Sequence, residues 1–295
     1  MEFRQLQHFL AAAQHGSLHA AADAVAISQP ALTKSIRRLE TALGVRLFER
    51  HVRGVRLTVF GEALLLHARS LEAERRHTDE TMRELRSTTS GLVRLGAGPS
   101  MSASLLPGLT ARLMEQGPAI RLHIRSGLND SLLAALQAGE IDFAITGMPA
   151  DPVAGLVHRL LFTDTVVVAA RRGHRLAAGA TIAELSHARW ILPNRNVLTH
   201  AHLMKLFNEH GLNGPDIWVE TDFVPYLLDV IAHTDLLSYV PVQLMKDRNL
   251  DIVDAPGITW RRPVSLSFRR RRTETPASRL LLSVLAEVVR ELHPG

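Results

Sequence analysis

Short polar and cationic side chains recur on one side of a helical pattern between residues 28 and 43. Apolar residues spaced four, three and four apart, as on the buried face of a helix, are Leu32, Ile36, Leu39 and Leu43. That spacing turns outward Gln29, Pro30, Thr33, Lys34 and Arg37. Amide and hydroxyl groups can hydrogen-bond to base edges, and cations bind phosphates. The pattern predicts a helix that reads DNA from its exposed face.

A basic turn follows this helix. Two short β-like pieces, Val45–Phe48 and Val55–Thr58, flank a turn in which Gly54 permits a tight reversal. Arg50 and Arg53 fall near the tip, where they could enter a narrow groove or contact phosphates. These residues predict a wing beside the reading helix.

Two helices must position the reading helix. Apolar residues from Phe3 recur at helical spacing until Gly16, and Ser17 can cap a second helix that ends near Val25. Ser28 is a candidate N-cap for the third helix, whose first turn tolerates Pro30. Residues 1–58 therefore predict an all-α helix-turn-helix completed by the wing.

The net charge supports a reader of polyanions. The 295 residues carry 34 Lys and Arg against 29 Asp and Glu, and the net of +5 lies in the segment from Ser28 to Arg56. Only three of the cations are Lys, so the pI near 10.3 reflects arginine and overstates the basicity. A solvated surface rich in Arg is the alternative interpretation.

A single long helix is expected from Thr58 to about Ser87, followed by a hinge that ends at Gly91. A four-three seam along it reads Leu64, Ala68, Leu71, Arg75, Thr78, Met82 and Leu85. The seam could form a coiled-coil dimer, or the helix could be solvated and packed on its own domain.

Beyond Gly91 strand and helix patterns alternate. The strand candidates are 92–97, 120–126, 141–146, 165–170, 190–192, 217–220, 236–240 and 264–268. Helices between most of them include 131–138, 198–210 and 223–233. This alternation predicts an α/β fold with mainly parallel sheets and helices on both faces.

Several function classes are excluded or disfavoured. With no cysteine, disulfides and thiol chemistry are impossible. No nucleophile elbow, Walker A loop, Rossmann fingerprint or metal-ligand spacing occurs, so neither an enzyme nor a metal or other cofactor is expected. The start lacks a signal-type apolar core and no stretch is long enough to span a bilayer, so we expect a cytoplasmic protein with no membrane partner.

The run SQPALTKSIRRLETALGVRLFERHVRGVRLTVFG from Ser28 to Gly61 resembles the N-terminal signature of LysR-type transcriptional regulators. The resemblance implies a bacterial regulator that binds an inverted repeat in double-stranded DNA and dimerises through a linker helix. It also implies a tetramer, contact with RNA polymerase, and control by a small effector. The DNA contacts it implies are Ser28, Gln29, Pro30, Thr33, Lys34, Arg37, Arg50 and Arg53. Lys34 stands where the family more often has Arg, which puts the base preference there in doubt.

The resemblance also divides the chain. Residues 1–58 are the winged helix-turn-helix, 59–89 the linker helix, 90–162 with 266–295 one effector subdomain, and 163–265 the other. Two such subdomains resemble a periplasmic binding protein, and a solute-binding protein of that type is the alternative function. Such a protein would need export, whereas this chain starts with a helix-turn-helix.

The effector is expected between the subdomains, at turns that follow strands. The residues placed there are Ser100, Met101, Ser102, Leu128, Asn129, Thr146, Gly147, Asn194, Arg195 and Phe223. The serines and Arg195 favour a small anionic organic effector, with Arg195 as the cation that meets it, although a neutral sugar could use the same groups. Ser100 could instead be an ordinary N-cap, and Phe223 could be core rather than an apolar wall of the site.

Overall fold

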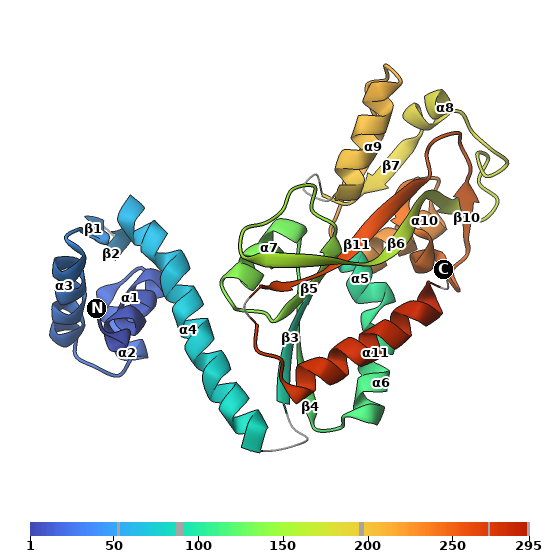
Figure 1. The fold of residues 1–295 in the computed structure, drawn as a ribbon. Helices are drawn as coiled ribbons and strands as arrows, with labels where there is room; N and C mark the ends of the chain where they lie inside the picture. Colours follow the sequence, from blue (N-terminus) through green and yellow to red (C-terminus); the bar gives the residue numbers. More distant parts are fainter. Residues whose placement is uncertain (52–53, 87–90, 195–197, 271, 294–295) are drawn as a thin grey trace. The chain divides into compact units, whose positions relative to one another are not determined.

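The structure is a computed structural model that describes residues 1–51, 54–86, 91–194, 198–270 and 272–293. The chain folds as two compact units (Figure 1). The N-terminal unit consists mainly of residues 1–83, and the C-terminal unit lies within 84–295.

Three short helices build the N-terminal unit: α1 Phe3–His15, α2 Leu18–Ala24 and α3 Gln29–Leu43. Their ends follow the predicted signals. Gly16 ends α1 in the left-handed conformation at φ +61°. The hydroxyls of Ser17 and Ser28 cap α2 and α3 by accepting the N–H of Ala20 and Ala31.

The buried face of α3 packs against α1 and α2. Leu32 and Ile36 lie in a cluster with Ala12, Ala21 and Ala22, and the Ser35 hydroxyl bonds the His8 ring of α1 at 2.7 Å. Leu39 lies in a second cluster with Leu6 and Phe9. Leu43 was expected in the core but is exposed, because it is the last residue of α3 before Gly44.

The wing strands are shifted from their expected positions. The antiparallel strands are β1 Phe48–His51 and β2 Gly54–Leu57. β1 starts later than predicted because the Glu40 carboxylate of α3 accepts the N–H groups of Leu47 at 2.8 Å and Phe48 at 3.4 Å. Residues 45–47 are thereby held against α3 rather than in the ladder.

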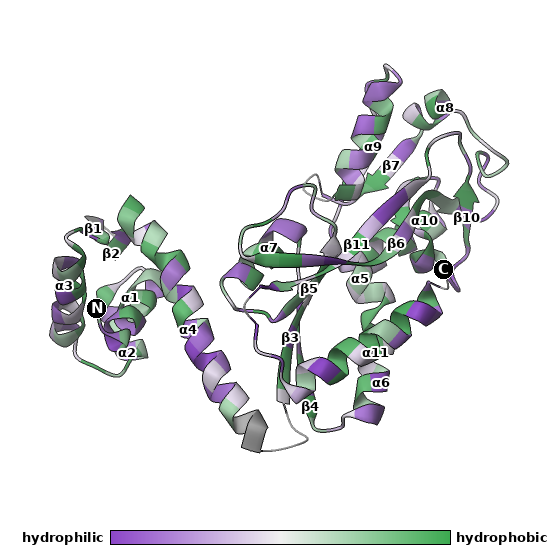
Figure 2. Ribbon diagram, viewed as in Figure 1, coloured by the Kyte–Doolittle hydropathy of each residue, from purple (hydrophilic) through white to green (hydrophobic). Residues whose placement is uncertain are grey.

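A long helix, α4 Val59–Arg86, follows the wing. Figure 2 shows hydrophobic and hydrophilic residues mixed along its first half and mostly hydrophilic ones along its second half. Leu64 and Ala68 pack into the cluster that holds Leu39, so this part of the expected seam belongs to the helix's own domain. Leu71 and Met82 of the same seam are exposed. Arg75 pairs within the helix with Glu72 and Asp79.

The C-terminal unit is built on a seven-stranded sheet. Its strands are β3 Gly91–Ala97, β4 Ile120–Ser126, β5 Phe143–Gly147, β6 Leu156–Arg171, β9 Ser238–Pro241, β10 Leu250–Val253 and β11 Trp260–Arg269. The order is β10-β6-β11-β5-β3-β4, and β9 also pairs with β6. A separate parallel pair consists of β7 Arg189–Leu192 and β8 Asp216–Glu220.

The expectation of mainly parallel sheets was wrong. In the seven-stranded sheet β3 runs parallel to β4 and β5, whereas β11 is antiparallel to β5 and β6, and β6 is antiparallel to β9 and β10. The reason is that β6 and β11 are far longer than predicted and pair with each other from Trp260 opposite Val166 to Arg269 opposite Leu156. β10 was not expected at all.

The remaining helices are α5 Pro99–Ser104, α6 Leu106–Gln116, α7 Asn129–Gln137, α8 Ile182–Ser186, α9 Leu198–Glu209, α10 Val224–His233, the 3₁₀ turn η1 Val242–Met245 and α11 Pro276–Leu292. With the sheet they enclose four apolar clusters of described residues. β6 contributes to every one, through Leu156, Phe162, Val166 and Val167 among others. The subdomain boundaries inferred from the sequence remain predictions.

Candidate nucleic-acid interface and ligand cleft

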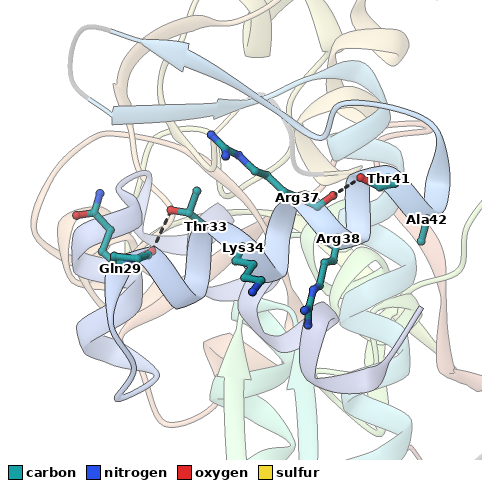
Figure 3. A pocket seen from close by; sticks show the side chains of 8 residues that line it. Gln29, Thr33, Lys34, Arg37, Arg38, Thr41 and Ala42 are labelled. Carbon is teal, nitrogen blue, oxygen red and sulfur yellow. Dashed lines mark hydrogen bonds between the residues drawn. The ribbon is translucent and has the colours of Figure 1, made fainter.

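The exposed face of α3 forms a shallow hollow in the N-terminal unit (Figure 3). Its lining residues are Gln29, Pro30, Thr33, Lys34, Arg37, Arg38, Thr41 and Ala42. We call this surface the α3 face. All eight lie on α3 in two adjacent series, in each of which successive residues are one helical turn apart. They therefore share one side of the helix.

Two hydroxyls of the α3 face bond to the helix backbone. Thr33 donates to the Gln29 carbonyl at 2.9 Å and Thr41 to the Arg37 carbonyl at 2.8 Å (Figure 3). Each hydroxyl oxygen keeps lone pairs with which it can accept a hydrogen bond. The exposed cations Lys34, Arg37 and Arg38 form no ion pair with another residue that the structure describes. Their charge is therefore available to an external anion.

Five of the residues expected to contact DNA line this face: Gln29, Pro30, Thr33, Lys34 and Arg37. Ser28 caps the start of the same helix. The Arg50 side chain and all of Arg53 lie outside the described part of the chain. Arg38 and Thr41 were missed, although each follows an expected contact by one helical turn, which was the signal available.

The wing is held at both ends within the N-terminal unit. Before β1, the Glu40 carboxylate binds the backbone and so fixes the wing to α3. After β2, the Thr58 hydroxyl donates to the Arg46 carbonyl at 2.7 Å and accepts the Gly61 N–H at the start of α4. Within β2, the Val55 N–H bonds to the Gly16 carbonyl at 2.9 Å. These bonds set the position of the wing relative to the α3 face.

In the C-terminal unit a hollow of about 40 Å³ lies at one edge of the sheet; we call it the edge hollow. Because β3, β4 and β5 are parallel neighbours, their carboxyl ends meet at this edge. The turns after them line the hollow with Gly98–Met101, Gly127–Asn129 and Thr146–Gly147, opposite Leu198 of α9. A methyl group on Gly147 would lie 2.6 Å from the Leu198 side chain, so a larger residue there would require Leu198 to shift.

A second hollow of about 60 Å³, the apolar hollow, shares Pro99, Ser100 and Arg262 with the edge hollow. Its wall comes mostly from α10, β9 and η1 and includes Val224, Leu227, Tyr239, Val240, Pro241 and Leu244. Besides Ser100, Arg262 and Tyr239, the polar lining residues are Thr199, Thr221 and Asp222. The Tyr239 hydroxyl donates to the Ile258 carbonyl at 2.7 Å, and burial raises the pKa of the phenol, so it stays protonated.

Arg262 of β11 stands where the two hollows meet. It lies directly opposite Asp164 of β6 in the antiparallel ladder, and the two side chains form an ion pair at 2.6 Å. The Arg262 side chain is 8% exposed and that of Asp164 is 1% exposed. Arg262 also reaches the Ser100 hydroxyl at 3.4 Å. Sequence reasoning missed both charged residues, because each sits in a strand that the patterns located only in part.

The structure brings six of the expected effector residues to the edge hollow: Ser100, Met101, Leu128, Asn129, Thr146 and Gly147. Ser102 lines neither hollow, because its hydroxyl donates to the Ala97 carbonyl at 3.3 Å. Asn194 also lines neither, and Phe223 is 62% exposed, so it is neither core nor a wall of these hollows. Arg195 lies outside the described residues.

Two further features were sought in the described ranges. Within them no three His, Asp or Glu side chains gather as a metal site would require. Nor does any described helix combine the length and apolarity needed to cross a membrane.

Comparison with protein families gives two matches. Residues 3–62 match the family described as bacterial regulatory helix-turn-helix protein, lysR family. Residues 86–290 match the family described as LysR substrate binding domain. Together they cover the α3 face and both hollows.

Curated relatives are similar over nearly the whole chain. An uncharacterised HTH-type transcriptional regulator, YdcI of Escherichia coli K12, is 27% identical over 97% of this chain and 95% of its own length. The SDS degradation transcriptional activation protein of Pseudomonas sp. strain ATCC 19151 is 29% identical over 97% of this chain and 96% of its own.

Solved structures share the fold. Full-length CbnR in complex with its target DNA covers 99% of both chains at a TM-score of 0.69 and 23% identity. A full-length OxyR variant from Pseudomonas aeruginosa covers 98% of this chain and 95% of its own at a TM-score of 0.69 and 21% identity.

Proposed function

We propose, since the chain belongs to the LysR family of transcriptional regulators, that it binds an inverted-repeat operator through the α3 face and the wing. Members of this family regulate transcription and are not enzymes, and the same holds for this chain. The cationic α3 face carries the proposal, because it joins amide and hydroxyl groups to three cations without described ion-pair partners. In this proposal Ser28, Arg50 and Arg53 add contacts to the DNA backbone.

Dimerisation through α4 would supply the two-fold symmetry that an inverted repeat requires. Phe60, Leu71 and Met82 are exposed and recur every eleven residues, about three helical turns, so they share one face of α4. We propose that this face pairs two chains, that dimers form a tetramer, and that the protein acts in the cytoplasm with RNA polymerase.

The two hollows of the C-terminal unit are the proposed effector site. They lie at the carboxyl ends of parallel strands, the usual position of ligands in such sheets, and Arg262 and Ser100 supply hydrogen-bond donors. Sequence reasoning favoured an anionic effector on account of Arg195. An effector changes DNA binding only if it binds two conformations of the protein unequally.

Lys34→Ala tests the DNA-binding part. A binding site is first selected from a random duplex pool with the wild-type chain, and affinity is then measured by fluorescence anisotropy over a salt series. Loss of one phosphate or base contact should weaken binding by about 1–3 kcal/mol and, for a phosphate contact, lower the salt slope by about one. Lys205→Ala is the matched control. Lys205 is an exposed lysine of α9, so its substitution removes the same charge from the C-terminal unit, away from the α3 face.

Equal losses in the two variants would show that net charge, not the α3 face, binds DNA. The alternative, a solute-binding protein, predicts no sequence preference in the selected pool. It is disfavoured by the helix-turn-helix match over residues 3–62.

A further inference from the structure

The cation at the centre of the proposed effector site is already neutralised within the protein. Arg262 faces both hollows, while Asp164 lies behind it, 2.6 Å away and almost fully buried. Among the described residues that line the two hollows, the other charged side chain is Asp222, an exposed carboxylate of the apolar hollow. The described surroundings of a ligand therefore carry no net positive charge.

The same surroundings are rich in hydrogen-bond donors. Ser100 and Thr146 present hydroxyls, and Thr146 is buried with no partner for its hydroxyl among the described residues. The Arg262 Nε–H is likewise without a described partner. Such donors call for oxygen acceptors, and neutral carbonyl or hydroxyl oxygens satisfy them without adding charge.

The other end of the site is apolar. Val224, Leu227, Val240 and Leu244 line the apolar hollow from one side. Hollows of about 40 and 60 Å³ each hold about three to six water-sized groups. The site thus fits a small molecule with one polar end and a short aliphatic or aromatic body.

We propose that Asp164 sets the charge preference of this site, which takes a small uncharged molecule whose carbonyl or hydroxyl oxygen meets Arg262 and Ser100. The inference rests on the proposed function of the hollows as the effector site. It departs from the anionic effector that the serines and Arg195 favoured in the sequence, and agrees with the neutral alternative left open there.

Electrostatics gives the reason. A ligand carboxylate at Arg262 would place a second negative charge beside Asp164 in a water-poor site, where like charges oppose each other's ionisation. It would also lose its own hydration, which a guanidinium already paired with Asp164 compensates poorly. Asn in place of Asp164 has nearly the same shape and can still accept the Arg262 bond, but it leaves the guanidinium charge uncompensated.

Matched ligand pairs on the full-length chain test the proposal. Benzamide against benzoate, and hexanamide against hexanoate, are titrated by calorimetry. The wild type should bind each amide at least about tenfold more tightly than its carboxylate, and Asp164→Asn should reverse the order. A wild type that prefers the carboxylates overturns the proposal, and Arg195→Gln then shows whether Arg195 causes that preference.

Sulfate provides a readout when none of these probes binds. At constant ionic strength, sulfate should raise the melting temperature of Asp164→Asn more than that of the wild type. The extra shift should vanish in the double variant Asp164→Asn/Arg262→Gln, which is the control for the general stabilising effect of sulfate. If Asp164→Asn gains no shift over the double variant, the proposal is overturned.

Failure of this inference is separable from failure of the proposed function. Charge preference is measured without DNA, whereas the Lys34→Ala experiment is measured without effector. If the wild type shows no sequence-specific DNA binding but Asp164→Asn still changes the charge preference for ligands, only the proposed DNA-binding function is rejected. The opposite result removes only the inference about Asp164.

Discussion

Arg262 and Asp164 stabilise the C-terminal unit only as a pair. Arg262→Ala leaves a carboxylate that is 1% exposed without its cation, which should lower the free energy of unfolding by about 3–5 kcal/mol. Replacing both by apolar residues, Arg262→Met with Asp164→Leu, should recover most of that loss. Urea unfolding followed by tryptophan fluorescence measures this directly, because Trp190, Trp218 and Trp260 all lie in the C-terminal unit.

The pair of variants guards against a simple packing explanation. If the double variant is as unstable as Arg262→Ala, the loss does not come from the unpaired charge of Asp164. The proposed role of Asp164 in ligand choice does not depend on this outcome, since it concerns charge and not stability.

At the residue level, helical spacing was sufficient to find the α3 face. Gln29, Thr33 and Lys34 could be placed because the buried residues of one helix fix the opposite side. The residues at the edge hollow were reachable from strand ends such as Thr146. Arg262 and Asp164 were not, because a charged residue in a strand looks like a surface residue until its partner strand is known.

At the level of elements, packing on the N-terminal unit and the proposed dimerisation are two roles of α4 that one apolar pattern cannot separate. Leu64 and Ala68 pack on the N-terminal unit, while Leu71 is 45% exposed on the face proposed for dimerisation. Leu71→Glu should weaken self-association by about tenfold or more, since a carboxylate would have to lose water in the seam. Analytical ultracentrifugation over a concentration series measures the change.

Leu66→Glu is the matched control for this helix. Leu66 is 65% exposed but lies on the far side of α4 from Phe60, Leu71 and Met82. The control should self-associate like the wild type. Equal weakening by both substitutions would place the dimer contact elsewhere.

Helix boundaries were predictable and long strands were not. Gly16, Ser17 and Ser28 act within a few residues of themselves, so their effect can be read locally. β6 contains His158, Arg159 and Asp164, which interrupt its apolar run. Its first half becomes a strand because β11 lies beside it, and a partner about a hundred residues away leaves no local signal.

Over the whole molecule, buried and partly buried imidazoles predict an acid-sensitive C-terminal unit. Burial is the main cause that lowers the pKa of His158, His174, His202 and His293 from the ordinary value near 6.5. The unfolded chain therefore takes up protons first as the pH falls. Stability is fully present above about pH 6.5 and is lost progressively below it.

Melting curves by tryptophan fluorescence between about pH 7.5 and pH 5.5 check this prediction. The midpoint should fall with pH, and His158→Gln should make the fall shallower. His123→Gln, on the exposed side of β4, should leave it unchanged. A midpoint that rises as the pH falls would contradict the assignment.

The charge distribution along the chain distinguished a basic N-terminal segment from a nearly neutral remainder. The direction of the strands in that remainder was predicted wrongly. Alternating strands and helices indicate parallel pairing only where each helix returns the chain to the same edge, as happens from β3 to β5. The long antiparallel pairing of β6 with β11 joins segments about a hundred residues apart, which local alternation cannot indicate.

That pairing bears on how a bound ligand could be signalled. β6 and β11 are hydrogen-bonded to one another past the hollows, with one register shift beside Val264, where Leu161 is the extra residue. Two strands that are hydrogen-bonded along their length cannot rotate independently. If the proposed effector site closes around a ligand, β6 and β11 would therefore bend together. Such bending would use part of the ligand's binding free energy, which dissociation of the ligand would return. The proposed regulator would then return to its unbound conformation when the ligand dissociates, with no other source of energy.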